Sequence, residues 1–217
     1  MITFDHFYNI HYGETGLIIC NGPSLRDVPD EFLKKYKNFG LNNIWLREKF
    51  TPDYYIACDP LAIRASIAEI LDIDTVKFIR NDYRLPDVYP LAIIPHPNEF
   101  SIDIAWGVVE GHSVTNVALQ IAYYMGFETI LIVGLDHRFT YQGPPDIMTE
   151  TLAEDTDVNH FSPDYFRGKP WNTPNLPESA RHFAIARKYY ESARRRIVNL
   201  TPDTALDVFE KDSIENW

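Results

Sequence analysis

The stretch VTNVALQIAYYMGFETILIVGLD, residues 114–136, decides the fold class of this chain. Over its first half the apolar residues recur at three- and four-residue intervals, the spacing of one helix face. Ser113 suits the N-cap of that helix, and Gly126 suits its C-terminal stop. Residues 129–133 then form a continuous apolar run, as is typical of a strand buried on both faces of a parallel sheet. The stretch therefore predicts a helix followed by a buried strand.

The same two patterns alternate through the rest of the chain. Further strands are predicted at 16–20, 54–58, 75–79 and 91–94, and further helices at 27–37, 61–71 and 178–196. Strands that alternate with helices indicate an α/β fold with a mainly parallel sheet flanked by helices, a Rossmann-like arrangement. The length of 217 residues fits one domain, 1–217.

Composition and charge exclude several classes of protein. A net charge of −11 argues against a nucleic-acid partner, which needs a basic face. No apolar run approaches the roughly 18 residues of a transmembrane helix, and no signal peptide is evident, so we expect a cytoplasmic location. Cys20 and Cys58 end apolar runs, as buried thiols would. Exposed aromatics near the chain ends, such as Trp217, make a homo-oligomer conceivable.

Residues 140–177 differ from the rest and are interpreted as a lid inserted into the domain. The segment contains six prolines and little periodicity, and long loops in compact domains are usually lids or binding loops unless they are disordered. Its aromatic residues argue against disorder. They are Phe161, Tyr165, Phe166 and Trp171.

Ligands of open α/β sheets bind beyond the carboxyl ends of the strands, so the residues after each strand are candidates for a binding site. The first turn is neither a dinucleotide fingerprint nor a P-loop, but a glycine there allows close backbone approach to a ligand. A tight turn with a helix cap is the structural alternative. The candidates that follow strands or short apolar stretches are Asn21, Gly22, Pro23, Ser24, Asn42, Asn43, Asp59 and Gly134.

The start of the 114–125 helix is a second candidate site. Gly111-His112-Ser113-Val114 places free N–H groups and a hydroxyl at a helix N-terminus, where an anion can bind. The alternative is a simple capped helix with an exposed His112.

Three residues are candidates for acid–base chemistry. His160 is the best by residue type, because its ordinary pKa is near neutrality. Asp136 follows a buried strand, and Asp164 lies in the lid. Asp136 and Asp157 are the candidates for Mg²⁺, although no zinc-type spacing is present and no cofactor is certain. Near the turns, only Arg26 and Arg80 could clamp a phosphate.

Three motifs together resemble the 6-hydroxymethylpterin diphosphokinase MptE-like family, which is similar in fold and motif to the bacterial family-42 sialyltransferases. They are Asn21-Gly22-Pro23-Ser24-Leu25, Gly111-His112-Ser113-Val114 with Ala118, Ala122 and Gly126, and Gly134-Leu135-Asp136. The resemblance covers roughly residues 15–200. It implies a Rossmann-like sheet and a transferase that depends on a nucleotide.

The sialyltransferase side of the resemblance implies a glycosyltransferase with a donor sugar activated by cytidine monophosphate (CMP). Asn21, Gly22, Asn42, Ser113 and Val114 would then hold the donor, and a lid histidine would act as the base. The acceptor would be a small molecule or a glycan.

Two alternatives remain open. A pterin pyrophosphokinase would transfer diphosphate from ATP to 6-hydroxymethyl-dihydropterin with Mg²⁺, since phosphoryl transfer relies on positioning and charge neutralisation. A chain that keeps the fold without the chemistry would be a non-catalytic module that binds a nucleotide or a glycan.

Overall fold

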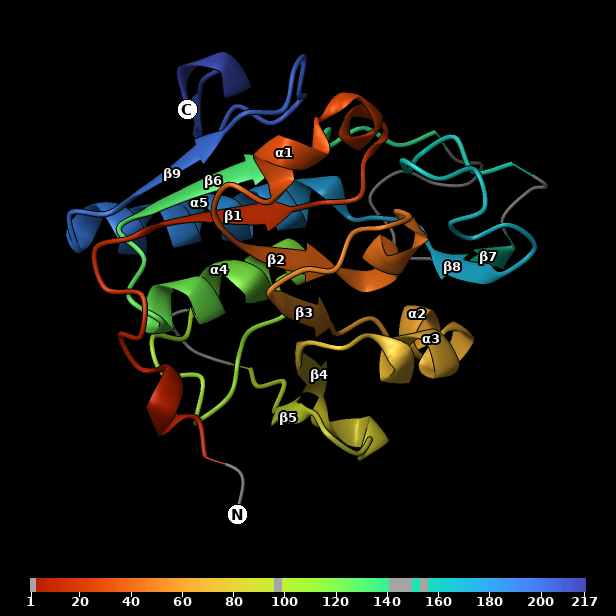
Figure 1. The fold of residues 1–217 in the computed structure, drawn as a ribbon, viewed down its shortest axis with the longest axis horizontal. Coiled ribbons are helices and arrows are strands. Elements are labelled where there is room, and N and C mark those ends of the chain that lie inside the picture. The colour runs from red at the N-terminus through yellow and green to blue at the C-terminus, as the bar shows by residue number, and fades with distance from the viewer. Residues whose placement is uncertain (1–2, 96–98, 141–149, 153–155) are drawn as a thin grey trace.

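The computed structural model describes residues 3–95, 99–140, 150–152 and 156–217. Parts of the predicted lid, residues 141–149 and 153–155, lie outside the described residues. Within the described part, the chain forms one large sheet, a small hairpin and helices on both faces of the large sheet (Figure 1).

The large sheet has eight strands in the order β10-β9-β6-β1-β2-β3-β4-β5, and every neighbouring pair is parallel. The predicted α/β class with a parallel sheet is therefore confirmed. The strands are β1 Thr15–Ile19, β2 Lys37–Leu41, β3 Tyr54–Ala57, β4 Val76–Arg80, β5 Tyr89–Leu91, β6 Thr129–Val133, β9 Arg196–Asn199 and β10 Glu210–Lys211.

Five α-helices and several 3-10 turns connect the described strands. The helices are α1 Asp30–Leu33, α2 Pro60–Ala65, α3 Ile67–Asp72, α4 Val114–Tyr124 and α5 Leu176–Ser192. Two of the 3-10 turns matter for the site, η2 Pro23–Asp27 after β1 and η3 Asn42–Leu46 after β2. Ser113 caps α4 by accepting a hydrogen bond from the Thr115 N–H, as its sequence predicts.

Side chains alternate between the two faces of the sheet and form two cores. On one face, Ile18 of β1 and Ile132 of β6 pack against α4 and α5. On the other face, Ile19 and Val133 belong to a core that also contains α2 and the lid aromatics. The lid aromatics are Phe161, Tyr165, Phe166 and Trp171. The described part of the lid is therefore packed into the domain, as its aromatic content predicts.

Several expected elements have different bounds in the structure. The helix expected at 27–37 is a 3-10 turn and a four-residue helix, because the chain must reach β2 at Lys37. The helix expected at 61–71 is broken at Ser66, which has non-helical dihedrals. The helix expected to reach Arg196 ends at Ser192, since Arg196 begins β9.

Strand β1 lies at the topological switch point, because the chain continues to β2 on one side and β6 lies on the other. The strand arrowheads in Figure 1 point toward the antiparallel hairpin of β7 Glu150–Leu152 and β8 Pro170–Asn172. The carboxyl ends of the strands and this hairpin thus frame one region. Among the described residues, none of the helices has the length and apolar character needed to cross a membrane.

Candidate functional site

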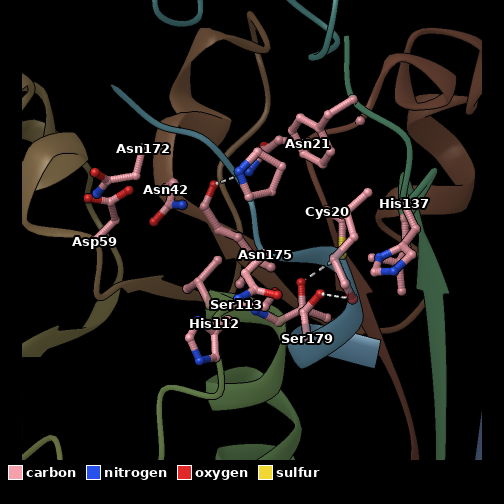
Figure 2. Close-up of a pocket in the computed structure, with 18 of the residues that line it drawn as sticks. Cys20, Asn21, Asn42, Asp59, His112, Ser113, His137, Asn172, Asn175 and Ser179 are labelled. Atoms are coloured by element: carbon pink, nitrogen blue, oxygen red, sulfur yellow. Dashed lines mark hydrogen bonds between the residues drawn. The ribbon is translucent and has the colours of Figure 1, made fainter. Parts of the chain in front are cut away.

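A cavity of about 660 Å³ opens at the carboxyl ends of β1, β2, β3 and β6. Its size is that of a small-molecule or cofactor site. Figure 2 shows side chains from strand ends, helix starts and the segment after β8 converging on it. The sequence-predicted residues that line it are Asn21, Gly22, Asn42, Asp59, Gly111, Ser113, Val114, Gly134, Asp136 and His160.

The turns after β1 and β6 form the floor of the cavity and approach each other closely. The Gly22 N–H donates to the Gly134 carbonyl at 2.9 Å. A Cβ atom on Gly22 would lie 2.0 Å from an Asp136 carboxylate oxygen, and one on Gly134 would lie 2.4 Å from the Cys20 carbonyl. Gly134 also has a φ of +70°, which favours glycine. These two glycines are therefore explained by close approach of the two turns.

Asp136 holds the first turn in place. Its carboxylate accepts from the Ser24 hydroxyl at 2.8 Å and from the Ser24 N–H at 3.2 Å. Ser24 and its neighbour Pro23 do not line the cavity. Asp136 thus positions the first turn and also lines the cavity, and its roles as a base or metal ligand stay predictions.

Asn21 and Asn42 line the cavity, and each has a buried amide oxygen without a hydrogen-bond partner. Asn21 is 8% exposed, and its Nδ2 donates to the Leu41 carbonyl at 2.8 Å, while its Oδ1 has no partner. Asn42 Oδ1 is also buried without a partner, and Asn42 has a φ of +44°. Leaving a buried acceptor unpaired costs free energy, so a ligand that supplies donors would be stabilised here.

Asn43 faces away from the cavity, although its sequence neighbour Asn42 lines it. Its Nδ2 donates to the Tyr165 carbonyl at 3.0 Å, and its Oδ1 accepts from Ser66. The amide is therefore used to hold the lid against the sheet, and the geometry offers no support for Asn43 as a nucleotide ligand.

The start of α4 supplies donors to the cavity. Gly111 and His112 both have a φ of +58°, and the Ser113 N–H closes their turn on the Glu110 carbonyl at 3.2 Å. A Cβ on Gly111 would lie 2.4 Å from Asn116 Nδ2. Because the first helical N–H groups have no intrahelical acceptor, the cavity faces a positive helix end at Val114.

Arg80, near the turns, makes its contacts within the protein. Arg80 donates to the Cys58 carbonyl at 2.8 Å and lies 3.7 Å from Glu110. Burial raises the pKa of Glu110, opposed by the charge of Arg80 and assisted by Asp59. Asp59 itself caps α2 by accepting from the Leu61 N–H. This side of the cavity therefore combines two carboxylates, Asp59 and Glu110, with one guanidinium, Arg80.

His160 and Asp157 form a hydrogen-bonded pair in the lid. His160 Nδ1 and Asp157 Oδ2 are 2.8 Å apart, and both residues are 8% exposed. Burial alone would raise the pKa of Asp157, but the hydrogen bond and charge of His160 outweigh it and lower the pKa. The imidazole also stacks on the Tyr165 ring, with centroids 3.9 Å apart. A carboxylate on one nitrogen fixes the tautomer and orientation of the ring and leaves Nε2 for a substrate.

Asp164 lies away from this pair. Its side chain is 58% exposed and bonds Arg167 at 3.1 Å, and it does not line the cavity. The geometry therefore offers no support for Asp164 as a base.

The start of α5 also lines the cavity, and this part of the site was not predicted from the sequence. Asn175 caps α5 by accepting from the Glu178 N–H, and Figure 2 shows Asn175 and Ser179 near Ser113. The capping asparagine followed by Leu-Pro was the available signal. Two more histidines, His137 and His182, line this part, and burial lowers the pKa of His137.

The residues suggested for magnesium are not gathered into a site. Asp136 is bonded to Ser24, and Asp157 is bonded to His160 and to the Asn159 N–H. In the part of the chain that the structure describes, no three His, Cys, Asp or Glu side chains form a metal-binding group. Mg²⁺ is usually bound by one or two carboxylates together with waters and substrate phosphates, so the role of Asp136 and Asp157 toward Mg²⁺ stays a prediction.

Comparison with known proteins identifies a family. A family model described as 6-hydroxymethylpterin diphosphokinase MptE-like matches residues 2–142. Neither a curated protein nor a solved structure matches the chain. The matched range includes both glycine turns and the start of α4, and it ends before His160.

Proposed function

Since the chain belongs to the 6-hydroxymethylpterin diphosphokinase MptE-like family of transferase-like enzymes, we propose that it is a nucleotide-dependent transferase that uses a CMP-activated sugar as donor. The observation that carries the proposal is that Asn21 and Asn42, whose Oδ1 atoms are buried without a partner, line one cavity together with the start of α4.

The cavity has two chemically different sides that fit the two halves of a nucleotide. Asn21, Asn42 and Asp59 present oxygen acceptors, which suit the hydroxyl and amino donors of a nucleoside. The start of α4 at Ser113 and Val114 presents the Ser113 hydroxyl and a positive dipole end, which suit a phosphate. A nucleoside phosphate that lies across the cavity would satisfy both sides.

The lid supplies the base for this transfer. In the proposed step, His160 Nε2 accepts the proton of the acceptor hydroxyl while Asp157 stabilises the imidazolium. The acceptor oxygen forms a bond to the anomeric carbon, and the bond from that carbon to the phosphate oxygen breaks. CMP leaves with the electron pair of that bond, and its added negative charge is stabilised at the start of α4.

A second candidate is diphosphate transfer from ATP to a hydroxymethyl pterin, and the description of the matching family favours it. That reaction needs the same activation of a hydroxyl but places more negative charge in the cavity. The carboxylates suggested for Mg²⁺ are bonded within the protein, and Arg26 and Arg80 are bonded to carbonyl groups. Because these groups already have partners within the protein, we place glycosyl transfer first.

The test is a thermal-shift panel with CMP, CDP, UDP, GDP and ATP, each with and without Mg²⁺. A nucleotide at about 100 times its dissociation constant should stabilise the protein by roughly 2.7 kcal/mol. Asn42→Ala should weaken that shift, whereas Asn81→Ala, on an exposed residue outside the cavity, should leave it unchanged. A Mg²⁺-independent shift with CMP is the expected result.

Turnover then separates the candidates. Release of CMP from a CMP-sugar in the presence of glycan acceptors supports the proposal. A shift with ATP and Mg²⁺ alone, together with AMP release in the presence of 6-hydroxymethyl-dihydropterin, supports the diphosphokinase. Nucleotide binding without turnover on either substrate set supports the non-catalytic module, and no binding at all refutes the nucleotide site.

A further inference from the structure

The lid segment that carries His160 is hydrogen-bonded to the turns after β1 and β2. The Phe161 N–H donates to the Asn21 carbonyl at 2.9 Å, and Asn43 Nδ2 donates to the Tyr165 carbonyl at 3.0 Å. The Asp157 N–H closes the segment on itself by donating to the Pro163 carbonyl at 2.9 Å. The base therefore sits on a closed loop that is tied to the residues lining the cavity.

Arg26 makes the most direct of these ties. Its Nη2 donates to the His160 carbonyl and its Nε donates to the Phe161 carbonyl, each at 2.7 Å. One guanidinium thus donates hydrogen bonds to the peptide carbonyls of both His160 and Phe161. Lysine could not reproduce this pair of bonds, because its ammonium is a single point donor without the planar fork of arginine.

The turn that carries Arg26 is itself fixed on two sides. Ser24 is held by the Asp136 carboxylate at 2.8 Å, on the β6 side. Arg47 donates to the Leu25 and Val28 carbonyls at 2.7 Å each, on the β2 side. The turn that carries Arg26 is therefore fixed to the sheet. The two bonds from Arg26 hold the backbone of His160 at a defined position relative to the sheet.

We infer that Arg26 is a positioning residue that sets the imidazole of His160 relative to the nucleotide side of the cavity. The inference rests on the proposed function for the reaction it serves, but the geometry it concerns can be tested without turnover. The Asn21 contact gives the same segment a second link, because the Asn21 carbonyl accepts from the Phe161 N–H and Asn21 itself lines the cavity. Loss of Arg26 should loosen the base and leave the nucleotide side intact.

The experiment compares R26M and R26K with R167M in the full-length chain. Arg167 is a matched control, since it is a lid arginine that pairs with Asp164 on the surface. In R26M, amide hydrogen exchange should accelerate over residues 157–166, with R26K intermediate and R167M at the wild-type rate. The thermal shift with CMP should stay the same in all three variants.

Kinetics provide the second readout. A misplacement of the base by about 1 Å can cost about 10²-fold in rate, so kcat should fall by about 10- to 100-fold in R26M while KM for the donor stays within about threefold. Unchanged exchange over residues 157–166 in R26M would overturn the inference, and so would a loss of CMP binding that equals the loss of rate. Absence of turnover in the wild-type protein would refute the proposed transfer and leave the exchange result to decide the role of Arg26.

Discussion

The two walls of the cavity are held together in different ways. The sheet wall consists of the turns after β1 and β6, which continue a parallel strand pair through the Cys20–Val133 and Gly22–Gly134 backbone bonds at 2.9 Å each. The lid wall consists of residues 156–172 and touches the sheet through the contacts of Arg26, Asn43 and Phe161 and through its aromatic core. Segments that depend on few bonds open locally before the core does. In the proposed function, the sheet wall binds the nucleotide and the lid wall supplies the base.

The largest expected effect lies in the lid wall. His160→Gln should lower kcat by about 10²- to 10⁴-fold, the range for loss of a general base, while nucleotide binding on the sheet wall is kept. Asp164→Asn is the control, because Asp164 is exposed and lies outside the cavity. Turnover of His160→Gln within a few-fold of wild type would contradict this division of roles.

The next effect lies in the sheet wall. Gly22→Ala would place a Cβ 2.0 Å from the Asp136 carboxylate and 2.7 Å from the Gly134 carbonyl, so the two turns must separate. We expect a loss of about 1–3 kcal/mol in the free energy of unfolding, the usual cost of overpacking, measured by denaturant titration. Ser24→Ala should cost less, because it removes one hydroxyl bond to Asp136 and creates no clash. Wild-type stability of Gly22→Ala would show that the turns are not tightly coupled.

The sheet wall is also the part that could be predicted from the sequence. The positions of the two turns were predicted from apolar runs that end in Asn-Gly-Pro and Gly-x-Asp. Their meeting at one edge of the sheet was predicted because ligand sites of open α/β sheets lie at the carboxyl ends of the strands. Strand β2 was not predicted, because its polar Asn38 hides the pattern; in the structure Asn38 is buried and bonded to the Leu33 carbonyl and to Asp53. Strand β9 was not predicted because the charged run before it extended the helix pattern.

The lid wall could be predicted only by residue type. The sequence shows a histidine and several carboxylates, but not which carboxylate meets the imidazole. Asp157 pairs with His160 because the loop closes on Pro163, whereas Asp164 turns toward Arg167. The role of Asn43 was likewise hidden, since adjacent asparagines point in different directions only once η3 is formed. Tertiary contacts decide these points, and no local pattern encodes them.

The pH dependence of stability tests the Asp157–His160 pair in the lid wall. The pKa of Asp157 is lowered in the fold, so its contribution to stability is present above the unfolded pKa of about 3.9 and is lost as the pH falls through the folded pKa. The difference in unfolding free energy between wild type and Asp157→Asn should therefore shrink in acid below about pH 4. A difference that stays constant from pH 3 to pH 7 would show that the Asp157–His160 pair contributes nothing to holding the lid.

The smallest effect concerns the thiol on the sheet wall. Burial raises the pKa of Cys20 to about 12, opposed by a hydrogen bond with the Thr115 hydroxyl, so almost no thiolate exists at neutral pH. Its Sγ lies 3.3 Å from that hydroxyl at the start of α4, so Cys20 belongs to the sheet wall even though it lines the cavity. We expect an aromatic disulfide reagent to modify Cys20 at pH 8 only at the rate of global unfolding. R26M should leave that rate almost unchanged, because loosening the lid does not move β1 away from α4. Rapid modification of Cys20 in R26M alone would show that opening the lid also disrupts the sheet wall, and the two walls would then be one cooperative unit.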